Sequence, residues 1–420
     1  MAPESGTSGG GEGHGAAAPR RARVLLAVSG GIAAYKIPEL VRILDRAGHA
    51  VRCALTPASE RFVSPLVLQT LTRHPVRTSL FDPGEESEID HIALADWAEL
   101  VIVAPATAHV LARMSHGLAD DLVTTLLLAT RAPVLVAPAM NVHMWEHAAT
   151  QENVGRLRSR GVHFVGPESG SLACGWEGRG RMAEPVAIAS AAELLLGPKS
   201  LAGERVLVSA GGTREPIDPV RAITNRSSGK MGFAIAGEAA RRGADVVLVA
   251  GPSALATPPG VQRIDVETAL EMREALLREL GPARVVVMTA AVGDFRPARP
   301  SDRKIKKEAL PEGAGISLEL VRNPDILEEI GRRKGDRLVV GFAAESHDLV
   351  AAARRKLARK GCDLLVANDV SREGAGFEGD TNAVVLVWPG GETEELPLLP
   401  KAEVAAQLWD RIEKLREARA

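Results

Sequence analysis

Cysteine, uncompensated charge and long hydrophobic runs are all scarce in this sequence of 420 residues. Its three cysteines, Cys53, Cys174 and Cys362, are far apart and odd in number, which excludes a dense disulfide framework and suits a reducing compartment. A formal net charge of −2 argues against a broad nucleic-acid-binding surface. The longest apolar run, residues 122–130, is much shorter than the ~20 residues of a membrane-spanning helix. We therefore expect a cytoplasmic globular protein with neither a nucleic-acid nor a membrane partner.

Two further features are missing. Residues 1–20 are rich in Gly, Ser and Ala but lack an apolar core, which predicts a disordered leader and no signal peptide. The central stretch at residues 211–232 has neither the G-x-x-x-x-G-K-[ST] nor the G-x-G-x-x-G spacing of the common phosphate-binding motifs. Any phosphate site there must be of another kind.

What the sequence does contain is two successive patterns of alternating strands and helices. Short apolar strands alternate with helices from residue 22, one helix spanning residues 108–129, and the alternation restarts after "GPKSLAGE" at residues 197–204. Such a pattern predicts parallel sheets covered on both faces. We expect an α/β protein with two tandem Rossmann-like domains, residues 21–198 and 199–420. The second should close with a β-hairpin that turns at residues 389–391 and a helix over residues 401–417.

Small and polar residues recur where the predicted strands end. They occupy residues 29–31, 56–57, 104–107 and 138–141 in the first domain, and residues 211–213, Asp294 and Phe342 in the second. Ligands of open parallel sheets bind at the carboxyl ends of the strands. Both domains are therefore expected to bind small molecules, although a fold alone names no reaction.

In the first domain, "SGGIAAYK" (residues 29–36) joins a strand to a helix. Its glycines allow close backbone approach to a phosphate, and a helix N-terminus offers free N–H groups. A plain tight turn explains this sequence about equally well. "APAT" (residues 104–107) and "PAMN" (residues 138–141) favour a site, because they place small residues, a hydroxyl and an amide at successive strand ends.

Together with "DHIALADWAELVIVAPAT" (residues 90–107) and "LACGWEGRGRM" (residues 172–182), these motifs resemble the flavin-dependent cysteine decarboxylase family. The resemblance covers roughly residues 22–190 and extends to its phosphopantothenoylcysteine decarboxylase members. It implies FMN as the cofactor and a trimer contact at the flavin. The residues expected at FMN are Gly30, Gly31, Ile32, Thr56, Ser59 and Thr107.

FMN suits the chemistry of this family. Loss of CO2 from an unactivated cysteine carboxylate leaves an unstabilised carbanion, so the reaction needs an electron sink. Oxidation of the side-chain thiol to a thioaldehyde provides one, because the carbanion is then stabilised as an ene-thiolate.

The resemblance gives roles to three residues that also have ordinary explanations. His91 would be the active-site base, although a lone histidine is more often a surface or capping residue. Asn141 would hold the substrate carboxylate, although an asparagine before a helix usually caps it. Cys174 lies in a glycine-rich flap and would act in reduction and reprotonation, although free cysteines usually have no such role. Cys53 and Cys362 lie inside predicted strands and are interpreted as core.

In the second domain, "GGTREPIDPVRAITNRSSGKMG" (residues 211–232) has the composition of a phosphate-binding loop. Its first two glycines allow close backbone approach, and Ser227-Ser228-Gly229 lead into a helix N-terminus. Arg214 and Arg221 can meet a phosphate or carboxylate with two-pronged hydrogen bonds. A solvated basic loop, the ordinary alternative, would not need two glycines, two prolines and a buried-looking strand before it.

This stretch resembles, almost residue for residue, the signature of the phosphopantothenate–cysteine ligase family. Five further motifs agree: "AAVGDFRP" (290–297), "KIKK" (304–307), "NPDI" (323–326), "GFAAE" (341–345) and "AND" (367–369). The resemblance covers about residues 202–415. It implies that CTP converts the carboxylate of 4′-phosphopantothenate to an acyl-cytidylate, which the cysteine amine then attacks.

The resemblance also assigns residues to these steps. Lys304, on a charged loop expected to be a mobile lid, would meet the charge at the α-phosphate. Asn225 would hold the acyl-nucleotide carbonyl, and Arg221 is linked to amide formation. The residues expected at CTP are Met288, Thr289, Ala290, Asp294, Lys304, Asn323, Pro324, Asp325, Ile326, Phe342, Lys356 and Lys360. Lys356 and Lys360 share one helix face, for which surface solvation is the ordinary explanation. Mg²⁺ or Mn²⁺ is expected with the triphosphate, although no carboxylate cage is visible.

The sequence therefore predicts a two-step enzyme of coenzyme A biosynthesis, which ligates cysteine to 4′-phosphopantothenate and then decarboxylates the product to 4′-phosphopantetheine. Trimeric contacts in the first domain and dimeric contacts in the second would build a larger homo-oligomer, such as a dodecamer. One alternative is a regulatory FMN-binding protein that acts through protein partners, against which the fused ligase argues. Another is a nicotinamide-dependent oxidoreductase, against which the missing G-x-G-x-x-G and ribose-binding acid argue.

Overall fold

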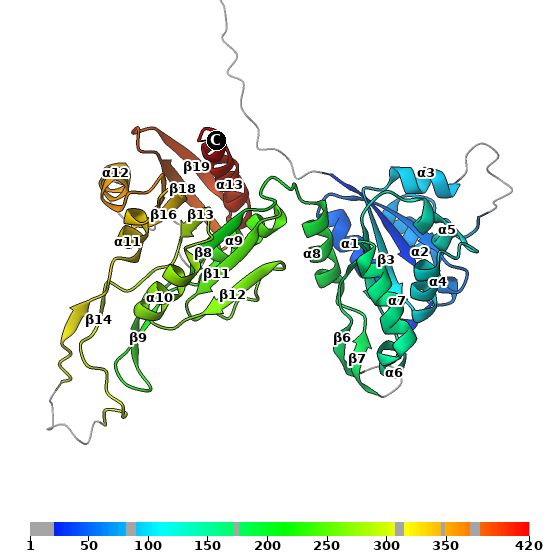
Figure 1. Ribbon diagram of the computed structural model, residues 1–420, viewed down its shortest axis with the longest axis horizontal. Helices are drawn as coiled ribbons and strands as arrows, with labels where there is room; N and C mark the ends of the chain where they lie inside the picture. The colour runs from blue at the N-terminus through cyan, green and yellow to red at the C-terminus, as the bar shows by residue number, and fades with distance from the viewer. Residues whose placement is uncertain are drawn as a thin grey trace, which may run out of the picture. The chain divides into compact units, whose positions relative to one another are not determined.

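The computed structural model of the chain describes residues 21–80, 90–171, 176–306, 315–345, 349–369 and 379–419 (Figure 1). The chain divides into two compact units between Leu196 and Gly197, two residues before the expected boundary. The expected disordered leader, residues 1–20, lies outside the described residues. Within the described ranges, no helix has the length and apolar character needed to cross a bilayer.

The first unit contains a five-stranded parallel sheet with the order β2-β1-β3-β4-β5. Its strands are β1 Arg23–Val28, β2 Ala50–Leu55, β3 Leu100–Ala106, β4 Val134–Pro138 and β5 His163–Phe164. This is the order of flavodoxin-like doubly wound sheets, and its direction reverses between β1 and β3. The expected parallel α/β architecture is confirmed for this unit.

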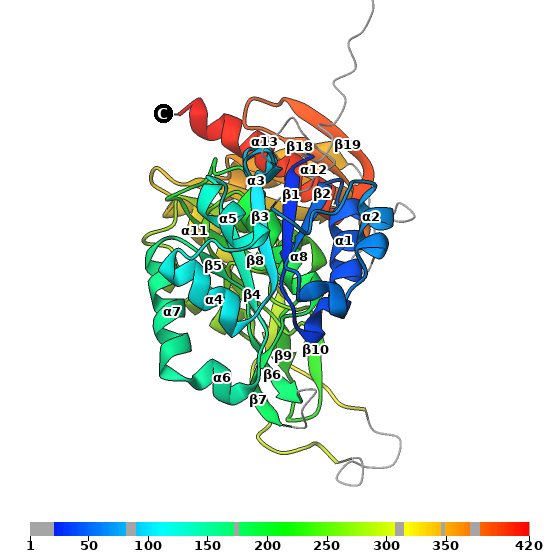
Figure 2. The same ribbon diagram turned by 90° about the vertical axis from the view of Figure 1, so that its right-hand side faces the viewer.

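Helices cover both faces of this sheet (Figure 2). Because successive strand residues point to opposite faces, Val24 and Leu26 of β1 pack with α1 and α8, whereas Leu25 packs with α4, α5 and α7. The helices are α1 Ile37–Arg46, α2 Pro65–Thr72, α3 Asp90–Trp97, α4 Ala108–His116, α5 Leu122–Ala129, α6 Val142–Glu146, α7 Ala148–Ser159 and α8 Pro185–Leu196, with short 3-10 turns at Ile32–Lys36 and Ser59–Arg61.

Residues 108–129 form two helices, so the single helix expected there is wrong. Gly117 ends α4 in the left-handed region, with φ of +69°. Asp121 then begins α5 with a capping box: its carboxylate accepts a hydrogen bond from the Thr124 N–H at 2.7 Å, and the Thr124 hydroxyl accepts one from the Asp121 N–H. A glycine stop followed by a capping box outweighs the continuous apolar pattern.

The second unit contains an eight-stranded sheet with the order β12-β11-β8-β13-β16-β17-β18-β19. Its strands are β8 Arg205–Ala210, β11 Asp245–Ala250, β12 Val261–Asp265, β13 Val285–Met288, β16 Leu338–Glu345, β17 Leu364–Asp369, β18 Thr381–Val387 and β19 Thr393–Pro400. The first six in chain order are parallel and follow the Rossmann order 3-2-1-4-5-6, which reverses between β8 and β13. The last two add an antiparallel hairpin, whose turn is closed by the Gly391 N–H and the Trp388 carbonyl, as expected.

Two small antiparallel ladders extend beyond the end of this sheet (Figure 1). One pairs β9 Arg214–Pro216 with β10 Ala222–Thr224, and the other pairs β14 Phe295–Pro297 with β15 Leu320–Arg322. The helices of the unit are α9 Lys230–Arg241, α10 Ala269–Glu279, α11 Ile326–Arg332, α12 Leu349–Lys360 and α13 Lys401–Glu417.

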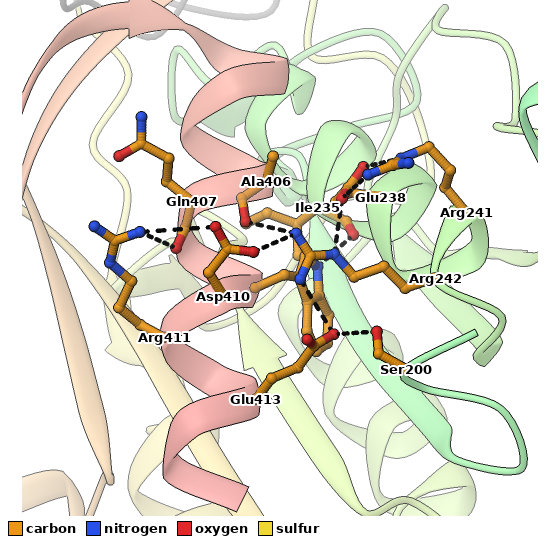
Figure 3. A network of polar contacts seen from close by, with 11 residues as sticks. Ser200, Ile235, Glu238, Arg241, Arg242, Ala406, Gln407, Asp410, Arg411 and Glu413 are labelled. Atoms are coloured by element: carbon orange, nitrogen blue, oxygen red, sulfur yellow. Dashed lines mark hydrogen bonds and ion pairs between the residues drawn. The ribbon is translucent and has the colours of Figure 1, made fainter. Parts of the chain in front are cut away.

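The C-terminal helix α13 is fixed to α9 by a buried polar network around Arg242 (Figure 3). The Arg242 guanidinium, whose side chain is 7% exposed, lies 2.8 Å from a Glu238 oxygen, 2.7 Å from an Asp410 oxygen and 3.1 Å from a Glu413 oxygen. The buried Trp409 indole N–H donates to the Ile235 carbonyl at 3.0 Å. The expected terminal helix is therefore part of the core of the second unit.

Candidate functional sites

The first candidate site lies where the order of the first sheet reverses, at the ends of β1 and β3. The Ser29 hydroxyl joins the two ends, because it donates to the Pro105 carbonyl at 2.6 Å and lies 3.4 Å from the Thr107 hydroxyl. Gly31 lies against Thr107, since a Cβ on Gly31 would be 3.4 Å from the Thr107 methyl group. The structure thus brings Gly31 and Thr107, both expected at FMN, to one edge of the sheet.

The end of β2 joins the same edge through Gly30. A Cβ on Gly30 would lie 2.6 Å from the Cβ of Ala58, so no larger residue fits without a shift of the chain. Nearby, the Ser59 hydroxyl donates to the Thr56 carbonyl at 2.6 Å. The Thr56 hydroxyl is buried without a hydrogen-bond partner. An unpartnered hydroxyl beside a glycine-lined strand end fits a polar ligand laid along the backbone.

His91 and Asn141 differ in their contacts. His91 is half-buried on α3, and its Nδ1 atom is buried without a partner. Asn141 caps α6: its side-chain oxygen accepts a hydrogen bond from the His143 N–H at 2.9 Å. The ordinary explanation of Asn141 therefore holds, and a role toward a substrate would be additional to the cap.

The strands on either side of the segment that contains Cys174, β6 Glu168–Ser171 and β7 Glu177–Arg181, pair in the antiparallel direction. Strand β7 packs on the "PAMN" turn, because the Met140 N–H donates to the Gly180 carbonyl at 2.9 Å. A Cβ on Gly180 would lie 2.3 Å from the Met140 carbonyl oxygen, which explains the glycine there. Cys174 itself lies outside the described residues, so its predicted role stays a prediction.

The second candidate site is a cavity of about 1100 Å³ at the carboxyl ends of β8, β13 and β16. Eleven of the twelve residues expected at CTP line it: Met288, Thr289, Ala290, Asp294, Asn323, Pro324, Asp325, Ile326, Phe342, Lys356 and Lys360. Asn225 and Ser227-Ser228-Gly229 of the central loop line it as well. Lys304 and Arg221 are not among its described lining residues. Lys304 is exposed on the segment at residues 301–306.

Hydrogen bonds between loops build the floor of this cavity. The Asn225 amide donates to the Ala291 and Val292 carbonyls at 3.1 and 3.2 Å. The Gly293 N–H donates to the Thr213 hydroxyl at 3.0 Å, and the Asn323 amide donates to the Gly293 carbonyl at 2.8 Å. The central loop, the loop after β13 and the "NPDI" segment are thus joined into one surface.

One predicted lysine is buried in the cavity wall. The Lys360 side chain is 9% exposed, forms an ion pair with Asp325, and lies 3.9 Å from a Glu328 oxygen. Burial lowers the pKa of Lys360 below its ordinary value, although the charge of Asp294 opposes this effect. Surface solvation therefore does not describe Lys360. Lys356, one turn earlier, is half-buried.

The cavity also contains residues that the sequence interpretation missed. Lys230, Arg359, Asn382 and Lys401 line it. Asn382 and Lys401 are 3% and 7% exposed, and the Asn382 side-chain oxygen has no hydrogen-bond partner. No motif marks Asn382 or Lys401, because the antiparallel pairing of β18 with β17, and of β19 with β18, is what brings them to this edge.

The described cysteines have no such setting. Burial raises the pKa of both Cys53 and Cys362 to about 12, which makes them poor nucleophiles. Cys53 lies inside β2 as expected, whereas Cys362 is buried just before β17 and not inside it. Among the described residues, no group of three or more His, Cys, Asp or Glu side chains could hold a metal ion.

The two strand orders, each with its lined site at the point of reversal, define a tandem doubly wound α/β protein. Comparison with known proteins adds the family. Residues 16–195 match the flavoprotein family, and residues 201–415 match the C-terminal domain of DNA/pantothenate metabolism flavoproteins.

Two curated relatives cover nearly the whole chain. The coenzyme A biosynthesis bifunctional protein CoaBC of Escherichia coli strain K12 is 49% identical over 392 residues, which are 93% of this chain and 96% of that protein. The protein of the same name from Vibrio cholerae is 48% identical over 391 residues, 93% of this chain and 97% of its own length. A crystal structure of a CoaBC C-terminal domain, 41% identical, covers 52% of this chain and 99% of its own with a TM-score of 0.45.

The chain belongs to the family of coenzyme A biosynthesis bifunctional proteins CoaBC. Membership confirms the expected enzyme with a phosphopantothenoylcysteine decarboxylase and a phosphopantothenate–cysteine ligase, in preference to a regulatory flavin-binding protein.

Proposed function

We propose that residues 197–420 use CTP to activate the carboxylate of 4′-phosphopantothenate and join it to L-cysteine, and that residues 21–196 decarboxylate the product with FMN. The observation that carries the ligase half is the cavity, which collects eleven residues chosen from separate motifs. A carboxylate oxygen attacks the α-phosphorus of CTP, and pyrophosphate leaves with the bonding electrons. The cysteine amine then attacks the acyl carbon, CMP leaves, and the ammonium loses its proton.

In the first half-reaction, cations and backbone N–H groups meet the triphosphate. Ser227-Ser228-Gly229 lead into α9, whose first turn lines the cavity, and Lys356 and Lys360 line the same cavity. Lys304 is exposed and so is free to approach the α-phosphate as negative charge develops there. Since the described residues form no carboxylate cage, Mg²⁺ or Mn²⁺ would enter with the triphosphate and not at a protein-built site.

In the second half-reaction, Asn225 and Arg221 act on the acyl-cytidylate. Asn225 would meet the acyl group, and this assignment is supported by its position in the cavity, where the Ala291 and Val292 carbonyls orient its amide. Arg221 lies on the turn after β9, where its guanidinium can receive the carboxylate of the incoming cysteine.

In the decarboxylase half, Gly30, Gly31 and Thr56 would hold FMN, with Ile32, Ser59 and Thr107 around them. When bound, FMN supplies the electron acceptor for the substrate thiol. His91 takes a proton at its unpartnered Nδ1 atom, and the amide of Asn141 holds the carboxylate that leaves as CO2. The decarboxylated product then takes back the two electrons that its thiol gave up, and Cys174 would supply the proton that completes this reduction.

We also infer a homo-oligomer. Ile32 and Tyr35, next to Gly31, are 62% and 64% exposed, which is costly for apolar side chains unless a second copy covers them. The exposed Phe295 on β14 supports a contact between ligase units in the same way. Trimeric contacts in one half and dimeric contacts in the other would give a closed particle such as a dodecamer.

The order of the half-reactions gives a direct test of the ligase proposal. Without cysteine, the protein should release one burst of pyrophosphate per site with CTP and 4′-phosphopantothenate, because the acyl-cytidylate stays bound. Addition of cysteine should convert the burst to steady turnover, and ATP should give neither. If pyrophosphate appears only after cysteine is added, activation through an acyl-nucleotide is wrong.

A further inference from the structure

The segment that carries Lys304 is attached to the turn at residues 217–221, far from it in sequence. The Ser301 N–H donates to the Ile217 carbonyl at 2.9 Å. Four residues later, the N–H and the carbonyl of Ile305 both form hydrogen bonds with side chains of this turn. Lys304 therefore lies between two anchored positions of an otherwise exposed segment.

Asp218 holds the first of these groups. Its side chain is 0% exposed, and its carboxylate accepts hydrogen bonds from three backbone N–H groups: Val220 at 2.8 Å, Arg221 at 2.9 Å and Ile305 at 3.2 Å. Burial would raise the pKa of Asp218, but these three hydrogen bonds and the Arg221 charge hold that pKa below its ordinary value. Asp218 is therefore ionised at neutral pH and aimed at the backbone next to Lys304.

Arg221 holds the second group. Its guanidinium donates to the Ile305 carbonyl at 2.7 Å, and its Nε lies 3.7 Å from the Asp218 carboxylate. The turn is closed on itself as well, because the Ile217 N–H donates to the Arg221 carbonyl at 2.8 Å. The Asp218 carboxylate, the Arg221 guanidinium and the two backbone groups of Ile305 thus form a closed set of contacts.

We propose that Asp218 is a positioning residue of the ligase, which sets the place of Lys304 by holding Ile305 directly and through Arg221. The inference rests on the proposed role of Lys304 at the α-phosphate. Lysine is a point charge on a flexible stem, so its backbone must be fixed for the charge to arrive where it is needed. Since Arg221 belongs to the amide-forming step, the same carboxylate connects the residues of both half-reactions.

The test is Asp218→Asn, which keeps the size and shape of the side chain. It removes the negative charge beside Arg221 and replaces one of the two oxygens that accept backbone hydrogen bonds with an NH2 group. The rate of CTP-dependent pyrophosphate release should fall about tenfold to a hundredfold, while the KM for CTP changes less than about twofold. In a Lys304→Gln background, Asp218→Asn should cause no further loss, because its effect acts through Lys304. Asp302→Asn, the same charge change at an exposed position of the same segment, should leave the rate unchanged.

Ile305→Pro is the second variant. It removes the N–H group that donates a hydrogen bond to Asp218, while Asp218 and Arg221 themselves stay unchanged. It should slow pyrophosphate release as Asp218→Asn does, again with no added loss in the Lys304→Gln background, even if Asp218→Asn fails to fold. An equal loss from either variant with and without Lys304 would overturn the positioning role. If Lys304→Gln alone leaves the rate unchanged, the proposed function of Lys304 fails instead, which is a distinguishable result.

Discussion

The two halves of this chain have the same kind of candidate site, at the point where the strand order of a sheet reverses, but they differ in how far the site is surrounded by residues. Each has a doubly wound parallel sheet with glycines and hydroxyls where the strand order reverses. In the second unit, the predicted residues surround one cavity of about 1100 Å³. In the first unit, Ile32, one of the residues expected at FMN, and the nearby Tyr35 have exposed side chains. The residues expected at the second site thus surround a cavity, whereas those expected at the first share one exposed edge of a sheet.

The largest expected effect is a loss of ligase activity with no change in flavin binding. Lys304→Gln should slow CTP-dependent pyrophosphate release by about a hundredfold or more, because the α-phosphate charge loses its cation. The flavin absorbance of the same protein should be unchanged, since Lys304 belongs to the other unit. Lys306→Gln, at a neighbouring exposed position, is the matched control. Pyrophosphate release at the normal rate in Lys304→Gln would remove Lys304 from the mechanism.

Cys174→Ser should have the opposite effect, a loss of decarboxylation with normal ligation. Ligation should continue at the normal rate, while phosphopantothenoylcysteine or an oxidised decarboxylated form accumulates, because a hydroxyl is a far weaker acid than a thiol and cannot supply the proton that completes the reduction. Mass spectrometry of the products and a pyrophosphate assay on the same sample measure both halves. Normal output of phosphopantetheine would show that Cys174 takes no part.

A smaller effect tests whether the glycine-lined edge holds the flavin. Gly30→Ala should reduce the FMN content of the purified protein several-fold, because the added Cβ would lie 2.6 Å from that of Ala58. Flavin absorbance per protein measures it. Gly155→Ala is the control: a Cβ there meets nothing within 4 Å, and alanine in helix α7 should stabilise it by up to about 1 kcal/mol. Equal flavin content in both variants would place the cofactor elsewhere.

The last prediction concerns the stability of the second unit and involves the smallest effect on activity. Arg242→Ala should lower the free energy of unfolding by about 3 kcal/mol, because Glu238, Asp410 and Glu413 lose their shared cation. Chemical denaturation measures the loss. Arg278→Ala, at a 61% exposed side chain, should cost less than about 1 kcal/mol. Equal losses in the two variants would mean that the network contributes nothing beyond a surface pair.

The pH dependence of this difference has a defined sign. Burial would raise the pKa of Glu238, but hydrogen bonds from Arg241 and Arg242 hold it below the ordinary value of 4.5. A lowered folded-state pKa stabilises the fold fully above the unfolded-state value, and this contribution is lost as the pH falls through the folded-state value. The gap between wild type and Arg242→Ala should therefore be constant at neutral pH and narrow below about pH 4.5. A gap that widens in acid would contradict this.

The fold could be predicted because it follows from local patterns, whereas most residues of the second cavity were expected from the resemblance to a ligase family. Parallel strand ends meet at one edge of a sheet, so Asp294, which follows β13, and Phe342, which lies in the last half of β16, were expected to share a site. Local residues, Gly117 and the Asp121 capping box, also mark the break between α4 and α5. The prediction missed this break because it gave more weight to the continuous apolar pattern.

The rest depends on pairings between distant segments, which no local pattern specifies. Lys401 and Asn382 reach the cavity through the register of an antiparallel extension. The contact of Asp218 with Ile305 joins two loops 87 positions apart. Before folding, Asp218 has the appearance of an ordinary turn residue between two prolines, and its three backbone partners are visible only in the folded chain.

The most direct test of the whole account is mass spectrometry of a single reaction. It would contain the purified protein, 4′-phosphopantothenate, L-cysteine, Mg²⁺ and CTP, with ATP in a parallel reaction. The account predicts 4′-phosphopantetheine with CTP and none with ATP, because both halves must act in turn and the first must use the cytidine nucleotide. The absence of both phosphopantothenoylcysteine and phosphopantetheine with either nucleotide would contradict it.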